Sequence, residues 1–179
     1  MSTPTETAEI ELELTYLAAK LPDELQGTEP KRLMDVYVPE SEVDHARLRL
    51  RQKGSKYEIT KKVPLRDGDA SAHTEMTIPL DQNEFTALIS VSQKRIIKDR
   101  YNIEIAGHPA EVDVFREELS GLVLIDFEFS NEEEKAAFTQ PSIALSDVTQ
   151  ENFIAGGLLA GKTYQDIEPE LQRFNYKAL

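Results

Sequence analysis

Short segments in which apolar and polar residues alternate recur along most of the chain. Four of them show the alternation most clearly, at residues 9–16, 46–51, 57–63 and 122–129. A period of two is typical of strands with one apolar and one polar face. Further strands are expected at residues 33–38, 73–79, 95–106 and 110–115. The chain is therefore expected to be mainly β, with an antiparallel sheet of several strands.

Helix signals occur in four segments between and after these strands. Asp81 is followed three residues later by Glu84, which is the pattern of a capping box. Ser130 and Glu133 repeat this pattern before a second segment. The four expected helices lie at residues 81–91, 131–138, 149–160 and 163–174. We expect them at the periphery, where they would cover the apolar faces of the strands.

Length and composition favour one globular domain over residues 1–179. Of the 179 residues, 40 % are apolar and 30 % are charged, a balance typical of a globular chain with a core. Residues 1–8 are expected to be flexible, and residues 163–179 to form a C-terminal helical segment. No apolar run approaches the roughly 18 residues of a membrane helix, and the polar start lacks a signal peptide's apolar core. We therefore expect a cytoplasmic protein without a membrane partner.

The charge balance and the missing cysteines narrow the possible chemistry. The formal net charge is −13, so we expect no nucleic acid partner, although binding of a small polyanion depends on local charge. Without cysteine, disulfides, thiolate metal sites and cysteine nucleophiles are excluded. Histidines could hold a metal, but His45, His73 and His108 lack the spacing of a metal site. All three are expected at the surface.

The polar faces of the expected strands are unusual because each carries charges of mainly one sign. One face has three glutamates, one has three arginines and one has two acids: Glu9, Glu11 and Glu13; Arg47, Arg49 and Arg51; Asp126 and Glu128. Charges two positions apart on a strand stand roughly 7 Å apart, so they repel each other unless counter-charges or a ligand are close. The plain alternative is that these are solvated faces that aid solubility.

A barrel would bring these faces together, because alternate side chains of every strand point into its lumen. Acidic walls would hold hard cations such as Mg²⁺ or Mn²⁺. Basic walls would hold phosphate oxygens, which arginine often binds with two parallel hydrogen bonds. A triphosphate with its metal requires both kinds of wall at once. The pattern thus favours a small-molecule triphosphate as the ligand.

Several short motifs follow one another between Glu11 and Thr149. In chain order they are Glu11-Leu-Glu13-Leu-Thr15-Tyr16-Leu17 with Leu21-Pro22, Leu48-Arg49-Leu50-Arg51 with Gly54, Thr60-Lys61-Lys62, Glu75-Met-Thr77-Ile78-Pro79, Lys98-Asp99-Arg100-Tyr101, Glu111-Val-Asp113-Val-Phe115, Asp126-Phe-Glu128-Phe129 and Asp147-Val-Thr149. Each piece is common by itself, but the ordered set resembles the CYTH (triphosphate tunnel metalloenzyme) family. The resemblance implies a closed antiparallel eight-stranded β-barrel with peripheral helices.

The resemblance also implies two sets of ligands inside the barrel. The implied ligands of one or two Mg²⁺ or Mn²⁺ ions are Glu11, Glu13, Asp126 and Glu128, with Glu75 as a further metal ligand or the partner of a base. The implied ligands of the phosphates are Arg49, Arg51, Lys62, Lys98 and Arg100. The alternative is that these bases only pair with acids of the tunnel.

Three more expectations concern single residues. Lys98 is the candidate catalytic residue, which would position or deprotonate water and would need a lowered pKa for this. Arg47 lies outside the family's arginine pair and is expected at the rim or in solvent. Asp113 is expected to be a structural or counter-ion residue.

Two residues depart from the family pattern. Thr15 stands where the first strand of the family carries a lysine, and Thr77 stands where the middle acidic strand has its second glutamate. In the family, the first-strand lysine and the lysine at the position of Lys98 are thought to act together on phosphate and water. Thr15 cannot supply that positive charge.

The leading expectation is metal-dependent hydrolysis of a triphosphate, with inorganic triphosphate first among the substrates. A non-catalytic binder of polyphosphate or nucleotide is the alternative that Thr15 motivates, and adenylate cyclase and thiamine triphosphatase are others within the family. The expected assembly is a monomer or a homodimer. Gly156-x4-Gly161-Lys162-Thr163 formally matches a P-loop. We expect no nucleotide fold there, because no apolar strand precedes the match and too few residues follow it.

Overall fold

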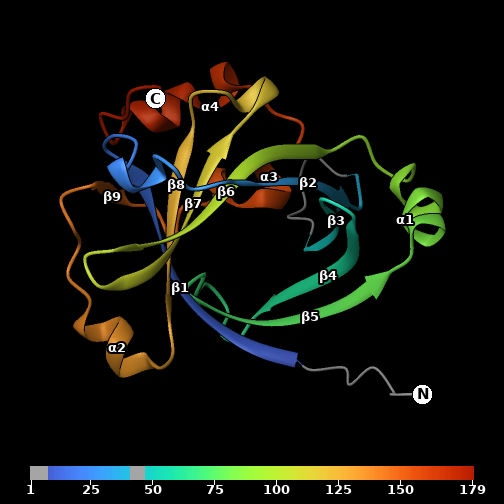
Figure 1. Ribbon diagram of the computed structural model, residues 1–179, viewed down its shortest axis with the longest axis horizontal. Helices are drawn as coiled ribbons and strands as arrows, with labels where there is room; N and C mark the ends of the chain where they lie inside the picture. The colour runs from blue at the N-terminus through green and yellow to red at the C-terminus, as the bar shows by residue number, and fades with distance from the viewer. Residues whose placement is uncertain (1–7, 41–46) are drawn as a thin grey trace.

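The computed structural model describes residues 8–40 and 47–179. In these residues eight antiparallel strands close into a barrel, because β1 pairs with β8 on one side and with β5 on the other (Figure 1). The strands are β1 (Ala8–Ala18), β2 (Lys31–Val38), β3 (Leu48–Lys53), β4 (Lys56–Pro64), β5 (Ala72–Leu80), β6 (Arg95–Ile105), β7 (His108–Phe115) and β8 (Val123–Phe129). A ninth strand, β9 (Ala144–Asp147), pairs with β1. The expected eight-stranded barrel is confirmed.

Two expectations fall partly on residues that the structure does not describe. The expected flexible start lies outside the described residues apart from Ala8, which begins β1. His45 and the first residue of the expected strand 46–51 also lie outside them. Within the described part of the chain, no helix is both long and apolar enough to span a bilayer.

Alternation along the strands directs apolar side chains outward and charged side chains into the lumen. The outward side chains of three strands form one buried cluster, which includes Leu12, Tyr16, Val112, Ile125 and Phe127. Helix α2 (Glu132–Ala137) lies against this face in Figure 1. Phe138, directly after the helix, packs on Phe127 with ring centroids 4.7 Å apart. Because this cover removes the outer apolar face from water, the polar face is left to form the lumen.

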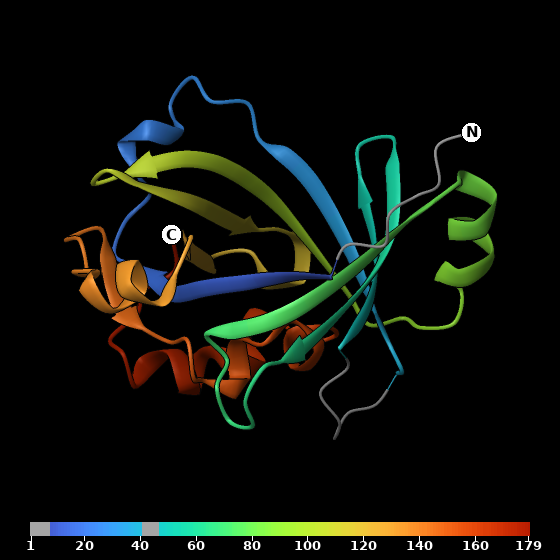
Figure 2. The same ribbon diagram turned by 90° about the horizontal axis from the view of Figure 1, so that it is seen from below.

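The C-terminal part of the chain closes one end of the barrel. Its helical elements are η3 (Asn152–Ile154), α3 (Gly156–Leu159) and α4 (Tyr164–Gln172). Their apolar side chains share one buried cluster with inward-facing residues at that end of the strands, namely Phe153, Leu159, Ile167 and Leu171 with Leu17, Phe115, Leu122 and Leu124. In Figure 2 these orange and red segments lie along one side of the barrel, and residues of η3 and α3 line the cavity inside it. The lumen therefore has an apolar floor.

The remaining helical elements are η1 (Asp23–Leu25), α1 (Gln82–Ile89) and η2 (Glu117–Leu119). Helix α1 begins with the expected capping box of Asp81 and Glu84. The start of α2 differs by one residue from the expectation. Asn131, not Ser130, is its N-cap, because the Asn131 Oδ1 accepts the backbone N–H of Glu134 at 2.9 Å.

The expected helix over residues 149–160 is wrong. The segment forms η3 and α3, which are separated by the extended residue Ala155. A Cβ atom at Gly156 would lie 1.9 Å from the Tyr37 Oη, so the backbone here packs directly on the tyrosine. The P-loop match also has another explanation, because Thr163 is the N-cap of α4 and forms a capping box with Asp166.

Candidate active site

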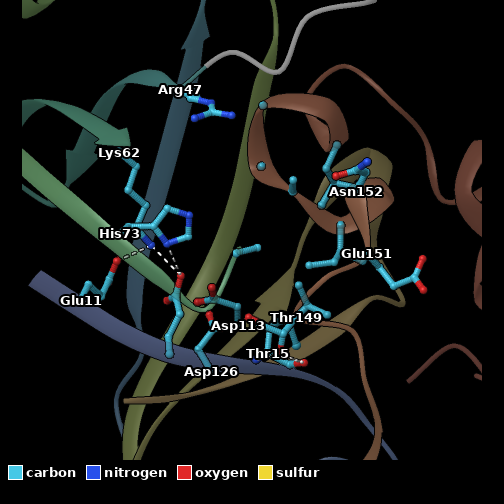
Figure 3. Close-up of a pocket in the computed structure, with 18 of the residues that line it drawn as sticks. Glu11, Thr15, Arg47, Lys62, His73, Asp113, Asp126, Thr149, Glu151 and Asn152 are labelled. Atoms are coloured by element: carbon cyan, nitrogen blue, oxygen red, sulfur yellow. Dashed lines mark hydrogen bonds and ion pairs between the residues drawn. The ribbon is translucent and has the colours of Figure 1, made fainter. Parts of the chain in front are cut away.

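A cavity of about 280 Å³ occupies the lumen, and all eight barrel strands contribute to its wall. Its inner end is apolar and includes Phe115, Leu124 and Leu159. Exposed residues such as Arg47 and Asn152 lie at its mouth. Between the mouth and the floor the wall is charged, and Figure 3 shows acids and bases pointing toward one another across it. A small polar molecule can therefore be enclosed by groups of both signs.

One wall pairs two glutamates of β1 with a lysine of β4. The Lys62 Nζ donates to the Glu13 Oε1 at 2.8 Å and also pairs with Glu11. Burial and the charge of Glu13 raise the pKa of Glu11. Burial acts in the same direction on the pKa of Glu13, but the charge of Lys62 outweighs it and the net shift is downward. This corner of the lumen thus already holds one positive charge between two carboxylates.

The opposite wall gathers two bases of β6 around one acid of β7. Asp113, which is 1 % exposed, accepts from the Arg100 Nε at 2.7 Å and also pairs with Lys98. The pKa of Asp113 is held well below its usual value, because these two cations outweigh the effect of its burial. Burial, and then the charge of Arg100, lower the pKa of Lys98. A lowered pKa is what a water-activating lysine requires, although the role itself stays a prediction.

Thr15 and Asp126 form a third element of the wall. The Thr15 Oγ1 donates to the Asp126 Oδ1 at 2.6 Å, and the backbone N–H of Thr15 donates to the Thr149 Oγ1 at 3.0 Å. Burial and the nearby charges of Glu13 and Asp113 raise the pKa of Asp126 to about 7. A neutral hydroxyl therefore contacts a carboxyl group that holds a proton up to near-neutral pH.

The raised pKa of Asp126 predicts a pH-dependent stability. A carboxyl group with a raised pKa in the folded state binds protons more tightly there than in the unfolded chain, so its contribution to stability falls as pH rises from about 4 to 7 and then stays constant. In metal-free protein, the parent should lose about 2–3 kcal/mol more of its unfolding free energy than Asp126→Asn between pH 5 and pH 8. Urea unfolding at both pH values measures this, and parallel pH profiles would contradict it.

Comparison with known proteins gives a related enzyme and solved structures of the same fold. An inorganic triphosphatase of Nitrosomonas europaea is 32 % identical over 143 residues, which cover 79 % of this chain and 90 % of the relative. Among solved structures, an inorganic triphosphatase is 29 % identical with a TM-score of 0.61, over 89 % of this chain and 95 % of that one. The chain belongs to the CYTH (triphosphate tunnel metalloenzyme) family.

More distant structures share the CYTH fold alone. A putative adenylate cyclase from Bacillus halodurans is 18 % identical, with a TM-score of 0.57 over 96 % of this chain and 92 % of that one. No family model matches the sequence. The CYTH membership therefore rests on the related triphosphatase and on the barrel.

Most of the expected site residues of this CYTH protein line one cavity. These are Glu11, Glu13, Arg49, Lys62, Lys98, Arg100 and Asp126. Arg49 is 15 % exposed and pairs with Glu75 at 3.3 Å, and its Nε is buried without a hydrogen-bond partner among residues 8–40 and 47–179. Arg47 is exposed at the mouth, as expected at the rim. Asp113 is the counter-ion that the sequence indicated.

Three expected ligands lie elsewhere in the CYTH tunnel. Arg51 does not line the cavity, because its Nε and Nη2 donate to Asp35 at 2.6 and 2.7 Å and the pair is buried. For Arg51 the geometry fits pairing with a tunnel acid rather than contact with phosphate. Glu75 and Glu128 line a second depression at the outer part of β1, together with Glu9 and Glu11. Glu75 and Glu128 each lie two positions farther along their strands than His73 and Asp126, which line the main cavity.

The expectation that His73 lies at the surface is wrong. Its side chain is 14 % exposed and lines the cavity, with its Nδ1 3.8 Å from the Glu13 Oε1. His73 lies two residues before Glu75 on β5, so strand alternation directs both inward, and this spacing could have revealed it. His108 is half-buried on the outer face, where its ring packs edge-on against Phe138.

Other cavity residues gave weaker signals in the sequence. Asp35 and Tyr37 alternate along β2 with outward apolar residues, and Glu111 precedes Asp113 by two positions on β7. Tyr37 and Glu111 line the cavity. Single polar residues in an apolar strand are weak signals for a site, since a turn or a core hydrogen bond produces the same pattern.

The carboxylates of Glu11 and Glu13 in this CYTH protein are arranged to bind a divalent cation. Both carboxylates point toward the same ammonium group, that of Lys62, and so converge on one point. Ligand atoms of Glu11, Glu13 and His73 all lie within 4.8 Å of one another. Carboxylate oxygens are the ligands that Mg²⁺ and Mn²⁺ prefer.

Proposed function

We propose that this chain hydrolyses a triphosphate inside the barrel, with inorganic triphosphate as the substrate and Mg²⁺ or Mn²⁺ as the cofactor. The observation that carries the proposal is the enclosed lumen, in which an acidic wall and a basic wall face each other. The 32 % identity with an inorganic triphosphatase also supports the proposal. A triphosphate with its cation presents the charges that such a lumen complements.

The cationic side chains of the lumen would grip the phosphates. Arg49 has a buried Nε with no partner among residues 8–40 and 47–179. Arg100 lines the cavity and is held by Asp113 and Glu111 of the neighbouring strand. Both are guanidinium groups, which bind phosphate oxygens with directed, paired hydrogen bonds. Because these donors are fixed by buried partners, they would stabilise charge that develops on the phosphoryl oxygens.

Lys98 is the group that we assign to the attacking water. It is buried, it carries a lowered pKa, and it is held by Asp113 beside Arg100. A positioned ammonium group can hold a water oxygen, and a lysine of lowered pKa can take up its proton. The cation at Glu11 and Glu13 would supply Lewis-acid neutralisation of the phosphate charge when bound.

The apolar floor favours a short inorganic substrate. Phe115, Leu124 and Leu159 close the inner end and offer no polar partner for a ribose. Any nucleoside would therefore have to extend through the mouth. The proposal predicts phosphate release from inorganic triphosphate at a higher kcat/KM than from ATP or thiamine triphosphate, and no cyclic AMP from ATP. Phosphate and nucleotide analysis of one substrate panel with Mg²⁺ and with Mn²⁺ tests this, and preference for ATP would contradict it.

One observation favours a second function, the binding of a polyphosphate without turnover. Thr15 contacts Asp126 where relatives are expected to hold a lysine, so one cation beside the substrate is missing. A pure binder would show inorganic triphosphate binding by calorimetry but no phosphate release, and Thr15→Lys would then raise turnover. Calorimetry and the phosphate assay on the same preparation distinguish the two functions.

A further inference from the structure

His73 lies in the lumen at the corner that holds the two carboxylates of β1. Its backbone pairs with that of Glu11 across the β1–β5 contact, so the two side chains leave neighbouring strands on the same side. The imidazole is 14 % exposed. In Figure 3 its ring points toward the space beside Glu11 and Lys62. The histidine therefore belongs to the wall that we propose for the cation.

The nitrogen of His73 that faces the carboxylates has no hydrogen bond. Its Nδ1 is buried and lacks a hydrogen-bond partner in the described ranges, residues 8–40 and 47–179. The nearest acid oxygen, Glu13 Oε1, is 3.8 Å away, which is beyond hydrogen-bonding distance. Burying such a nitrogen without a partner costs free energy. A ligand in the lumen would supply the missing partner.

The geometry of the corner fits a shared cation. The ligand atoms of Glu11, Glu13 and His73 lie within 4.8 Å of one another. Bonds of about 2.1 Å place two ligands of one ion at most about 4.2 Å apart, so small side-chain rotations close the difference. The ammonium group of Lys62 now bridges the two carboxylates. A divalent ion at this point would take over that role and free Lys62 to turn toward phosphate.

We infer that His73 is a third protein ligand of the divalent cation, beside Glu11 and Glu13. The inference rests on the proposed function, because it takes the two glutamates as the metal site. An imidazole nitrogen among carboxylates favours Mn²⁺, Co²⁺ or Zn²⁺ over the oxygen-seeking Mg²⁺ and Ca²⁺. His73 would thus determine which metal the site selects.

The test is electron spin echo envelope modulation of Mn²⁺ added to the metal-stripped protein without substrate. A bound Mn²⁺ ion with an imidazole ligand shows coupling to ¹⁴N. We expect this coupling in the parent, its loss in His73→Gln, and its retention in His108→Gln. The latter histidine packs against Phe138 on the outer face and serves as the matched control.

Calorimetric titration supplies a second readout. His73→Gln should weaken Mn²⁺ binding at least about tenfold, because even loss of an outer partner of a metal ligand costs that much. Mg²⁺ binding should change by less than about threefold, because Mg²⁺ depends on oxygen ligands. Bound Mn²⁺ without ¹⁴N coupling in the parent, or with coupling that persists in His73→Gln, would overturn the inference and leave the carboxylate site intact. No binding of Mn²⁺ by the parent would overturn the proposed metal site as well.

Discussion

Arg49→Ala should lower kcat/KM for inorganic triphosphate by about two to three orders of magnitude, the cost of removing one fixed donor to developing charge. Arg49 is the lumen arginine whose Nε is buried and lacks a hydrogen bond within residues 8–40 and 47–179. Its contact with Glu75 at 3.3 Å holds the side chain without occupying the Nε. The initial rate of phosphate release over a range of substrate concentrations measures the loss.

Arg47→Ala is the matched control for this prediction. Arg47 lies two residues earlier on the same side of the chain but is exposed at the mouth. Arg47→Ala should lower kcat/KM less than about tenfold, because solvent and salt screen the charge of an exposed side chain. A larger loss for Arg47→Ala than for Arg49→Ala would contradict our placement of the substrate in the lumen. Thermal unfolding of both variants shows whether the fold is retained.

Asp113→Asn should lower the free energy of unfolding by about 3–5 kcal/mol, because it removes the ion-pair partner of the buried Lys98 and one of the partners of the buried Arg100, which Glu111 still pairs. Asp113 is 1 % exposed and holds both Lys98 and Arg100. Inorganic triphosphate should restore part of the stability, since its oxygens can neutralise the same two cations. Urea unfolding with and without the ligand measures both effects.

Asp99→Asn provides the comparison for this second prediction. Asp99 also pairs with two arginines, Arg32 and Arg116, but their side chains are 63 % and 42 % exposed. Water can solvate these arginines when the carboxylate is lost, so the destabilisation should be smaller, about 1 kcal/mol. Equal losses for the two variants, or no stabilisation of Asp113→Asn by triphosphate, would contradict the account of the basic wall.

The sequence predicts the barrel well because alternation has a direct geometric meaning. In β1, Glu11 and Glu13 must leave the strand on one side and Leu12 on the other, whatever the rest of the fold. The closure of the sheet is different, since β1 pairs with β5 across some 60 residues of chain. Alternation alone contains no signal for that pairing. The segregated charges favoured a closed barrel, and the resemblance to a family gave it eight strands.

Which residues of a strand line the cavity was harder to predict than which face of the strand they occupy. Arg49 and Arg51 share a face, yet Arg51 turns to the buried Asp35 whereas Arg49 lines the cavity. Alternation cannot show this, because the partner comes from another strand. His73 was missed because it was placed at a strand end, although its spacing of two residues from Glu75 puts both side chains on the lumen face. The apolar floor was also hidden, because it depends on how the C-terminal segment packs.

We propose that a triphosphate is hydrolysed at the charged walls of the lumen with a divalent cation. The most direct test is the rate of phosphate release from inorganic triphosphate by the purified chain and by Glu13→Gln, with Mg²⁺ or Mn²⁺ and with a chelator. Glu13 lies on the acidic wall beside Lys62. We predict metal-dependent release by the parent and its loss in the variant. Absence of release by the parent, or equal rates for both proteins, would contradict the claim.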